Sequence, residues 1–434
     1  MSKTPIFNTP YLNDYMKMVE DTESPRLFHV WAALSAVSAS LGRRCYLPFG
    51  PMVIYPNQYI LVVGNPGTRK STAVGFMKKV LKDSTGIRFA PQDTSGQRQG
   101  MVTAMQSRQS DKILLDGVDL AAADNSMGAL TLAEISEVVI EEEEAFAHEA
   151  DRHHMMIVAS EFSRFIGQNN IAMLEFLTTM WDGDDYEYQL KNTLTELKNP
   201  LLNMIGATTP TSIALSMPPA AGGQGFLSRV ILVYGARKYK SVPRPSAPDA
   251  DLVLKVKNVI NRSYYELDGP IQETDDARAY SESLYDYGLE ISDSRFGYYN
   301  ERRYTHLIKL AMSLCAARGD SRIVRDDYEE AHRILRATER GMPDALGEFG
   351  MNPLAQLKQS ILENVRMNVV VDMAVLQAQF HRDAKPQDIS QVVNDLQRVN
   401  QLKIIQGQSG AISVHAAYNQ EDTEESMMEM LSEK

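Results

Sequence analysis

Cysteine is nearly absent from this sequence: its 434 residues include only Cys45 and Cys315, which lie far apart along the chain. Two such residues supply neither a disulfide framework nor a zinc cluster, and they suit a reducing compartment. No apolar run approaches the roughly 18 residues that span a bilayer. The first residues lack a basic start followed by an apolar core, so we expect no signal peptide. These absences predict a cytoplasmic protein with no membrane partner.

Positive charge is also in deficit. Lys and Arg number 44 against 56 Asp and Glu, which gives a formal net charge of −12. This balance argues against a chain that coats nucleic acid over its whole surface. A basic channel stays compatible with it, because a ring can gather its positive charge on an inner face. No internal repeat is present, and the length predicts two or three domains.

Four apolar runs predict buried strands. They are "QYILVVG", "HMMIVASEF", "PLLNMIGATT" and "LSRVILVYG". Continuous apolar runs are typical of strands buried on both faces, and helical patterns separate these four. Residues 45–242 therefore predict an α/β core with three layers and a mostly parallel sheet. The acidic, weakly patterned stretch 108–150 is expected to be an insertion into it.

The regions around this core have their own patterns. Residues 1–44 predict a helical N-terminal segment, and 243–345, after a proline-rich joint at 241–251, predict a helical domain. Residues 350–418 predict three short helices and a hairpin turned at 407–410, which is typical of a winged helix. Residues 419–434 are acidic and are expected to form a disordered tail.

The segment "VVGNPGTRKST" lies between a predicted strand and a predicted helix, which is the context of a phosphate-binding loop. Such a loop binds ATP because backbone N–H groups and a helix N-terminus surround the phosphates, while lysine adds charge and serine holds Mg²⁺. Arg69 replaces the usual last glycine, and the cradle survives if this residue keeps a negative φ. The alternative is a purely structural turn. The candidate nucleotide-binding residues are Gly64, Asn65, Pro66, Gly67, Thr68, Arg69, Lys70, Ser71 and Thr72, with Ser71 also a metal ligand.

Two further strand ends carry polar side chains. Ser160-Glu161 follows "MMIVA", where an ATPase needs a carboxylate that orients the attacking water or holds magnesium. Glu161 takes that role here and is a second candidate metal ligand; the alternative is that it only caps the next helix. Thr209 is the candidate that contacts the γ-phosphate or the water, with Thr208 and Asn203 as lesser candidates or, alternatively, as structural residues.

The segment "GGQGFLSRVILVYG" places Arg229 directly before the last predicted strand. An arginine there can reach from a subunit edge into the neighbouring ATP site and offset charge on the transferred phosphoryl group. Only a ring gives Arg229 such a target, so this hypothesis predicts a homo-oligomer, which we take as a hexamer.

Taken in order, these segments and the helical "ERRYTHLIKLAMSLCAARGDSRIVRDDYEEAHRIL" resemble AAA+ ATPases over roughly 25–340. The chain looks closest to the helicase-like P-loop proteins of phages and mobile elements, and more remotely like the minichromosome maintenance helicases. In that remote group a Leu-Ser-Arg turn carries the arginine finger and matches residues 227–229. A lid arginine that reads the γ-phosphate there suggests Arg302 or Arg303. The residue before proline is asparagine there, so Thr209 is a departure.

The resemblance implies a P-loop AAA+ core with a helical lid, ATP and Mg²⁺ as cofactors, and host cytoplasm as the location if a phage encodes the chain. It implies a ring-shaped DNA helicase or translocase of phage-type replication, with single-stranded or forked DNA through the ring centre. A helicase loader or replication-initiation scaffold that uses ATP as a switch is the alternative. A third hypothesis, a DNA-binding adaptor with an inactive ATPase fold, rests on Arg69 and Ser160.

Weaker features leave alternatives open. His148, His153 and His154 do not share one helical face, so a solvated segment is favoured over a metal site. Asp182 either shapes a surface hairpin or lines the pore side of the ATPase. The third helix of 350–418 either contacts DNA or docks a protein, because its charge is nearly balanced. The acidic tail either docks a replication protein or is a solvated end.

Overall fold

The computed structural model describes residues 6–91, 97–106, 151–190, 193–217, 225–286, 290–347, 349, 353–381, 384–406 and 412–417. The predicted insertion at 108–150, the tail at 419–434 and the turn at 407–410 lie outside these residues, as does His148. Among the described residues, no helix combines the length and the apolarity needed to cross a membrane.

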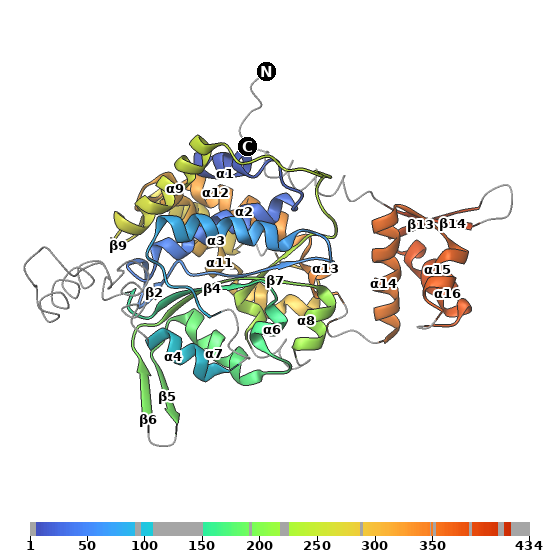
Figure 1. The fold of residues 1–434 in the computed structure, drawn as a ribbon, viewed down its shortest axis with the longest axis horizontal. Coiled ribbons are helices and arrows are strands. Elements are labelled where there is room, and N and C mark those ends of the chain that lie inside the picture. Colours follow the sequence, from blue (N-terminus) through green and yellow to red (C-terminus); the bar gives the residue numbers. More distant parts are fainter. Residues whose placement is uncertain are drawn as a thin grey trace, which may run out of the picture.

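A parallel sheet of four strands forms the centre of the larger part of the chain (Figure 1). Its order is β4 (His154–Ala159), β7 (Leu201–Thr208), β3 (Tyr59–Val63) and β8 (Val230–Tyr234). Every residue of β3, β4 and β7 is buried, which explains their continuous apolar sequences. Phe89 adds a parallel bridge to Met156 on the outer side of β4. The predicted mixed α/β fold with a parallel sheet is confirmed.

Helices cover both faces of this sheet (Figure 1). One face carries α2 (Arg26–Leu41) and α3 (Lys70–Ser84), with α1 (Pro10–Met18) packed on α2. The other carries α4 (Arg98–Gln106), α6 (Phe162–Ile166), α7 (Ile171–Asp182) and α8 (Pro210–Ser216). In α2 every residue from Leu27 to Leu41 is buried, because the helix lies between the sheet and further helices.

Five helices follow β8 in the chain, and the first and third of them pack on α2: α9 (Ala250–Tyr265), α10 (Asp275–Asp286), α11 (Gly297–Arg318), α12 (Arg325–Glu339) and α13 (Met342–Leu346). Their buried side chains belong to the same hydrophobic core as the sheet. The region 243–345, which the sequence suggested as a separate domain, therefore shares its core with the sheet. Short strands also pair here. The strand β1 (Cys45–Phe49) pairs with β2 (Met52–Ile54) and with β9 (Gly269–Pro270) of the helical region, and within that region β10 (Gln272–Glu273) pairs with β11 (Arg322–Ile323).

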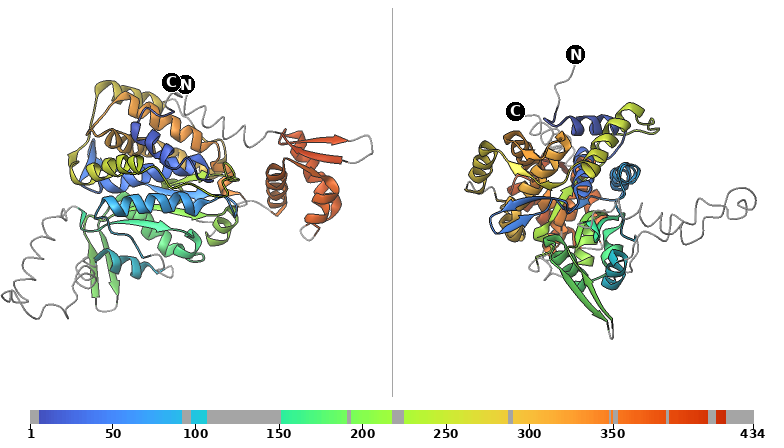
Figure 2. Two further views of the ribbon diagram at one scale, coloured as in Figure 1. Left: turned by 45° about the horizontal axis from the view of Figure 1, so that its top comes forward. Right: turned by 90° about the vertical axis from the view of Figure 1, so that its left-hand side faces the viewer.

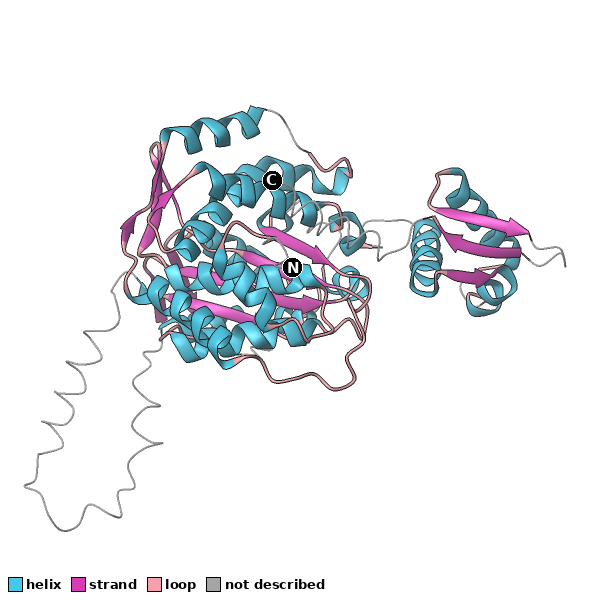
Figure 3. Cartoon of the chain, turned by 90° about the horizontal axis from the view of Figure 1, so that it is seen from above, coloured by secondary structure: helices cyan, strands magenta, loops and turns pink. Residues whose placement is uncertain are grey.

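The C-terminal module, whose helices and strands are drawn in Figure 3, has a hydrophobic core of its own. It contains α14 (Pro353–Asn368), β12 (Val370–Asp372), α15 (Met373–Gln379), α16 (Pro386–Arg398), β13 (Leu402–Gln406) and β14 (Ile412–Ala416). The three helices and the hairpin strands are where the sequence predicts them, and β12 is an additional strand that pairs with β14. The side chains of Ile361, Val365, Ile389 and Val393 are among those buried here.

A two-stranded hairpin, β5 (Tyr186–Leu190) and β6 (Thr193–Leu197), projects away from the sheet (Figure 2). It follows α7 and precedes β7, so it extends from the end of the sheet at which β7 begins. The segment "WDGDDYEYQ" thus forms the start of a surface hairpin, one of the two alternatives for it.

Candidate functional site

Residues 64–69 connect the C-terminal end of β3 to the N-terminus of α3. The first N–H groups of a helix have no intrahelical acceptor, so α3 directs free donors toward this connection. The N–H of Gly64 donates to the carbonyl of Thr208 at 3.2 Å, which fixes the start of the loop against the neighbouring strand β7. The strand, loop and helix order predicted from the sequence is present.

The two glycines of the loop have different reasons to be glycine. A Cβ on Gly64 would lie 2.2 Å from the carbonyl oxygen of Gly235 and 2.9 Å from the Thr68 hydroxyl, so no larger residue fits. Gly67 has a φ of 91°, a conformation that other residues rarely adopt. The loop is thus a tight backbone turn, whose shape depends on glycine at both positions.

Lys70 is folded into the loop. Its Nζ donates to the carbonyl of Gly64 at 2.5 Å and to that of Asn65 at 3.0 Å, and it lies 3.4 Å from the Thr68 hydroxyl. Burial lowers the pKa of Lys70. Ser71 is exposed in the first turn of α3. The Lys70 ammonium is thus held inside the turn of the loop by two main-chain carbonyls.

Arg69 adopts the left-handed conformation, with φ 59° and ψ 30°. The condition set from the sequence for an intact cradle, a negative φ at residue 69, is therefore not met: Arg69 has the left-handed backbone that normally selects glycine. The Arg69 carbonyl accepts from the Ser24 hydroxyl at 2.8 Å, and its Nε donates to Glu23 at 2.6 Å. These contacts from the α1–α2 connection offset the cost of a left-handed non-glycine residue.

The ends of three strands meet beside the loop. Val63 pairs with Thr208, and Ala159 pairs with Gly206, so Glu161 and Thr209 lie just past the edge at which the loop begins. Strands are about 4.8 Å apart, which puts the end of β4 about 10 Å from that of β3. This distance accommodates a terminal phosphate and a water molecule between loop and carboxylate.

Glu161 occupies the N-cap position of α6, yet its side chain makes no capping hydrogen bond. It is exposed, and no described contact occupies its carboxylate. The capping alternative raised by the sequence is therefore not realised. Ser160 beside it is exposed as well. The carboxylate is thus available for a water molecule or a metal ion, although no cluster of metal-ligating groups exists among the described residues.

The threonines have partners. Thr209 caps α8: its hydroxyl accepts from the Ser212 N–H at 3.1 Å and donates to the Ser212 hydroxyl at 2.8 Å. Asn203, a lesser candidate, is fully buried near the start of β7, where it binds Ser38 and His154. Asn203 is therefore a core residue far from the loop, and Thr208 and Thr209 are the polar residues that end β7.

Arg229 lies directly before β8, at the end of the sheet where the parallel strands begin. The loop lies at the other end, where β3 finishes. The Arg229 side chain is 8% exposed and points into its own subunit, where Nη2 lies 2.5 Å from Asp182. The guanidinium also lies over the Trp181 ring, 5.5 Å from its centroid. If Arg229 is to contact a neighbouring subunit, its ion pair with Asp182 has to open first. The sequence alone did not suggest this ion pair.

Arg302 joins the same cluster, 3.6 Å from Asp182 and 5.4 Å from the Trp181 centroid. Arg303 is buried and binds Glu339 through two nitrogens at 2.6 and 3.1 Å. Neither arginine lies at the loop of its own chain, because Arg302 contacts Asp182 and Arg303 is paired with Glu339 inside the core. Arg302 is 34% exposed and contacts the same carboxylate, Asp182, as Arg229.

Sequence patterns missed Lys309 in this cluster. Its Nζ donates to Asn57 at 2.6 Å and lies 4.1 Å from the Trp181 centroid. Burial lowers its pKa to about 7. Three basic side chains, Arg229, Arg302 and Lys309, thus surround Trp181. Asp182 is the carboxylate that the two arginines share. In the sequence, Lys309 is a single lysine in an apolar helix, and no motif around it indicates that it is buried beside Trp181.

Among the described residues, His153 and His154 belong to no cluster of metal-ligating groups. His153 contacts the Lys198 carbonyl at 2.6 Å, and His154 is buried against Asn203. Burial lowers the pKa of His154 to about 4. The favoured alternative of a solvated segment is wrong for His154, which is a core residue.

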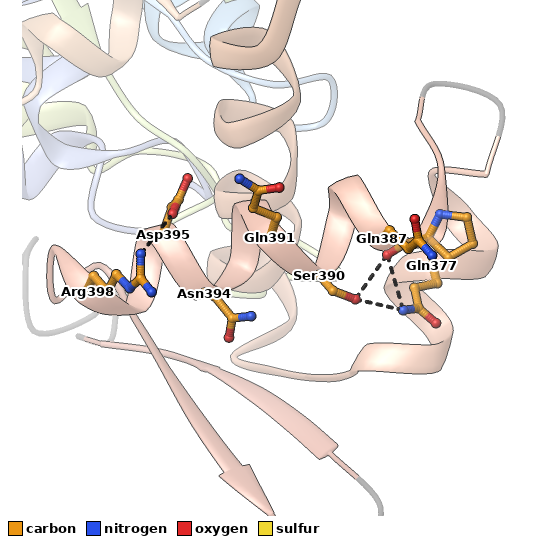
Figure 4. A pocket seen from close by; sticks show the side chains of 8 residues that line it. Gln377, Gln387, Ser390, Gln391, Asn394, Asp395 and Arg398 are labelled. Carbon is orange, nitrogen blue, oxygen red and sulfur yellow. Dashed lines mark hydrogen bonds and ion pairs between the residues drawn. The ribbon is translucent and has the colours of Figure 1, made fainter.

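A groove runs between α15 and α16 in the C-terminal module (Figure 4). Its lining is rich in uncharged amides, and Gln377 donates to the Ser390 hydroxyl at 3.0 Å. Asp395 binds Lys358 at 3.2 Å, which leaves the groove with little net charge. The lining residues are Gln377, Pro386, Gln387, Ser390, Gln391, Asn394, Asp395 and Arg398.

Comparison with known proteins adds no relative: no protein-family model matches this chain, and no curated protein matches it.

Proposed function

We propose that this chain is an ATP-driven DNA helicase or translocase of the AAA+ type that works as a ring in phage-type replication. One observation carries the proposal. The glycine loop with Lys70 and Ser71, the end of β7 at Thr208, and the unoccupied carboxylate of Glu161 come together at one edge of a parallel sheet. That constellation supports binding and hydrolysis of a nucleoside triphosphate, because it offers phosphate donors and a water-orienting carboxylate side by side.

Each residue has a defined task in this proposal. The loop N–H groups and Lys70 bind the β- and γ-phosphates, and the exposed Ser71 hydroxyl contributes to the Mg²⁺ site. Bound Mg²⁺ supplies charge neutralisation between these phosphates. Glu161 orients the attacking water from the end of β4, and Thr208 or Thr209 lies between it and the loop.

Across the subunit boundary, Arg229 and Arg302 act together in this proposal. They lie around Asp182 and Trp181 at the sheet edge opposite the loop, and they are 8% and 34% exposed. A neighbour's triphosphate docked there meets two guanidiniums. DNA in the ring centre and a replication protein on the tail remain partners of the proposed machine.

The first test is nucleotide binding. Lys70→Ala removes the ammonium from the loop, and calorimetry with a non-hydrolysable ATP analogue and Mg²⁺ should then show no binding. Lys79→Ala is the matched control, because Lys79 is an exposed lysine on the same helix. Equal affinity in Lys70→Ala and the control rules out this loop as the triphosphate site.

A second candidate is an ATP-controlled switch, such as a helicase loader or initiation scaffold without strand separation. The inward-facing Arg229 favours it, because a finger held at 2.5 Å by its own Asp182 does not reach a neighbour. Hydrolysis measured with and without forked DNA separates the two. Stimulated turnover together with strand separation supports the helicase, whereas assembly with negligible turnover supports the switch.

A further inference from the structure

The segment between α1 and α2 lies against the phosphate loop. Glu23 in this segment is 11% exposed, and its Oε2 accepts from Nε of Arg69 at 2.6 Å. Ser24, the next residue, is 1% exposed and donates its hydroxyl to the Arg69 carbonyl at 2.8 Å. Two adjacent residues thus bind both the side chain and the main chain of the one loop position that departs from glycine.

Glu23 also binds the segment that follows β8. Its Oε1 accepts from Nζ of Lys238 at 2.9 Å and from the N–H of Val242 at 2.9 Å. Hydrogen bonds from Lys238, Val242 and Arg69 lower the pKa of Glu23 to about 2. The carboxylate is therefore ionised at neutral pH, with a charged donor on each oxygen.

Residue 69 needs such restraint. Its φ of 59° lies in the left-handed region, which arginine populates rarely and glycine freely. Without restraint an arginine favours a negative φ, and that change would turn the peptide plane at residue 69 relative to the rest of the loop. The position of residue 69 therefore decides how well the cradle fits a phosphate.

We propose that Glu23 is a positioning residue for the phosphate loop, which holds Arg69 in the left-handed conformation that a glycine would adopt unaided. This role rests on the proposed nucleotide site and adds to it a residue outside the loop. Glu23 does not touch the nucleotide in this proposal; it acts only through Arg69. Its contacts with Lys238 and Val242 hold the carboxylate in place beside the loop.

A double-mutant cycle tests this role, with affinity for a non-hydrolysable ATP analogue and Mg²⁺ measured by calorimetry on the full chain. Glu23→Gln removes the charge and is expected to weaken binding about five-fold, the order of the left-handed penalty. Arg69→Gly is expected to bind at least as tightly as the wild type, because glycine needs no restraint. In the Arg69→Gly background, Glu23→Gln is expected to have no effect on affinity.

Asp21→Asn is the matched control. Asp21 lies in the same segment and accepts from the N–H of Ser246 at 2.7 Å, and its described contacts go to the segment after β8 and not to Arg69. It should leave affinity unchanged. Unfolding temperatures are recorded for every variant, because a merely structural Glu23 changes them without a dependence of affinity on residue 69.

The outcomes separate the two proposals. Loss of affinity by Glu23→Gln that is equal in both backgrounds overturns the role, since Glu23 then acts through the other segment. Unchanged affinity in Glu23→Gln alone overturns it too, while leaving the nucleotide site intact. A wild-type chain that binds no analogue overturns the nucleotide site and the role of Glu23 with it.

Discussion

Arg229 and Asp182 form an ion pair of 2.5 Å within one chain, at the sheet edge opposite the phosphate loop. Arg302 lies 3.6 Å from the same carboxylate, and both guanidiniums flank Trp181. Asp182 therefore neutralises the two arginines that the proposed ring needs at its subunit boundary. The carboxylate and a neighbour's phosphate compete for the same donors, since each guanidinium has a limited set of N–H groups.

Asp182→Asn should shift this competition toward the phosphate. We expect assembly in the presence of ATP analogue to begin at lower protein concentration than in the wild type, as measured by light scattering. The substitution also removes one partner of a pair that is partly exposed. We expect a loss of about 1–2 kcal/mol in the free energy of unfolding, below the value for fully buried pairs. A fall in stability without any change in the assembly threshold would show that the pair is only structural.

Arg229→Ala should leave nucleotide affinity within about two-fold of the wild type and abolish hydrolysis, because the phosphate loop lies at the other edge. When the variant is mixed into wild type, activity should fall more steeply than the fraction of variant. The measurement is steady-state phosphate release at a fixed total concentration. A strictly proportional fall contradicts action across a subunit boundary. Glu187→Gln, on the projecting hairpin, serves as the mixing control.

The sheet and the loop were predictable because their determinants are local. Buried parallel strands have continuous apolar sequences, as in β3 and β7, and a glycine turn between strand and helix marks the loop. The order of the strands, with β7 between β3 and β4, depends on pairings that no single segment shows. The strands β9, β10 and β11 span two residues each, which is too short for any period to show.

The orientation of the arginines was not predictable, because it depends on partners distant in sequence. Asp182 is 47 residues from Arg229, and Glu339 is 36 from Arg303. Arg69 illustrates the same limit: its left-handed backbone is held by Glu23, 46 residues away. A single sequence shows that these positions carry charge, but it does not show which carboxylate each guanidinium meets.

Buried histidines make the fold sensitive to acid. Burial lowers the pKa of His306 to about 3 from its ordinary value of 6.5, and its Nε2 donates to the Ser228 carbonyl at 2.9 Å. The folded chain keeps this ring neutral while the unfolded chain protonates it below pH 6.5. Stability is therefore complete above pH 6.5 and falls as the pH decreases, by about 2 kcal/mol for this histidine between pH 6.5 and 5.

The corresponding variant is His306→Gln, whose amide can still donate to the Ser228 carbonyl. Its free energy of unfolding, measured with urea at pH 7 and pH 5, should change less with pH than that of the wild type, by about 2 kcal/mol. An identical pH dependence in both proteins would mean that His306 is protonated in the folded chain.

Two roles were left open for the C-terminal module, contact with DNA and docking of a protein. Substitutions in the amide-lined groove beside α16 can distinguish them. Gln391 and Asn394 are exposed on the groove side of the helix, and their amides can pair with an adenine edge in the major groove (Figure 4). The opposite face of the helix buries Ile389, Val392 and Val393, so these substitutions leave the core untouched. We expect Gln391→Ala with Asn394→Ala to weaken binding to duplex DNA about ten-fold, measured by fluorescence anisotropy at one fixed salt concentration.

Gln397→Ala is the control, because Gln397 is exposed on the same helix but does not line the groove. Equal affinity in both variants rules out base contacts from this face and favours protein docking, since amides without a nucleic-acid partner are still suited to hydrogen bonds with a peptide backbone.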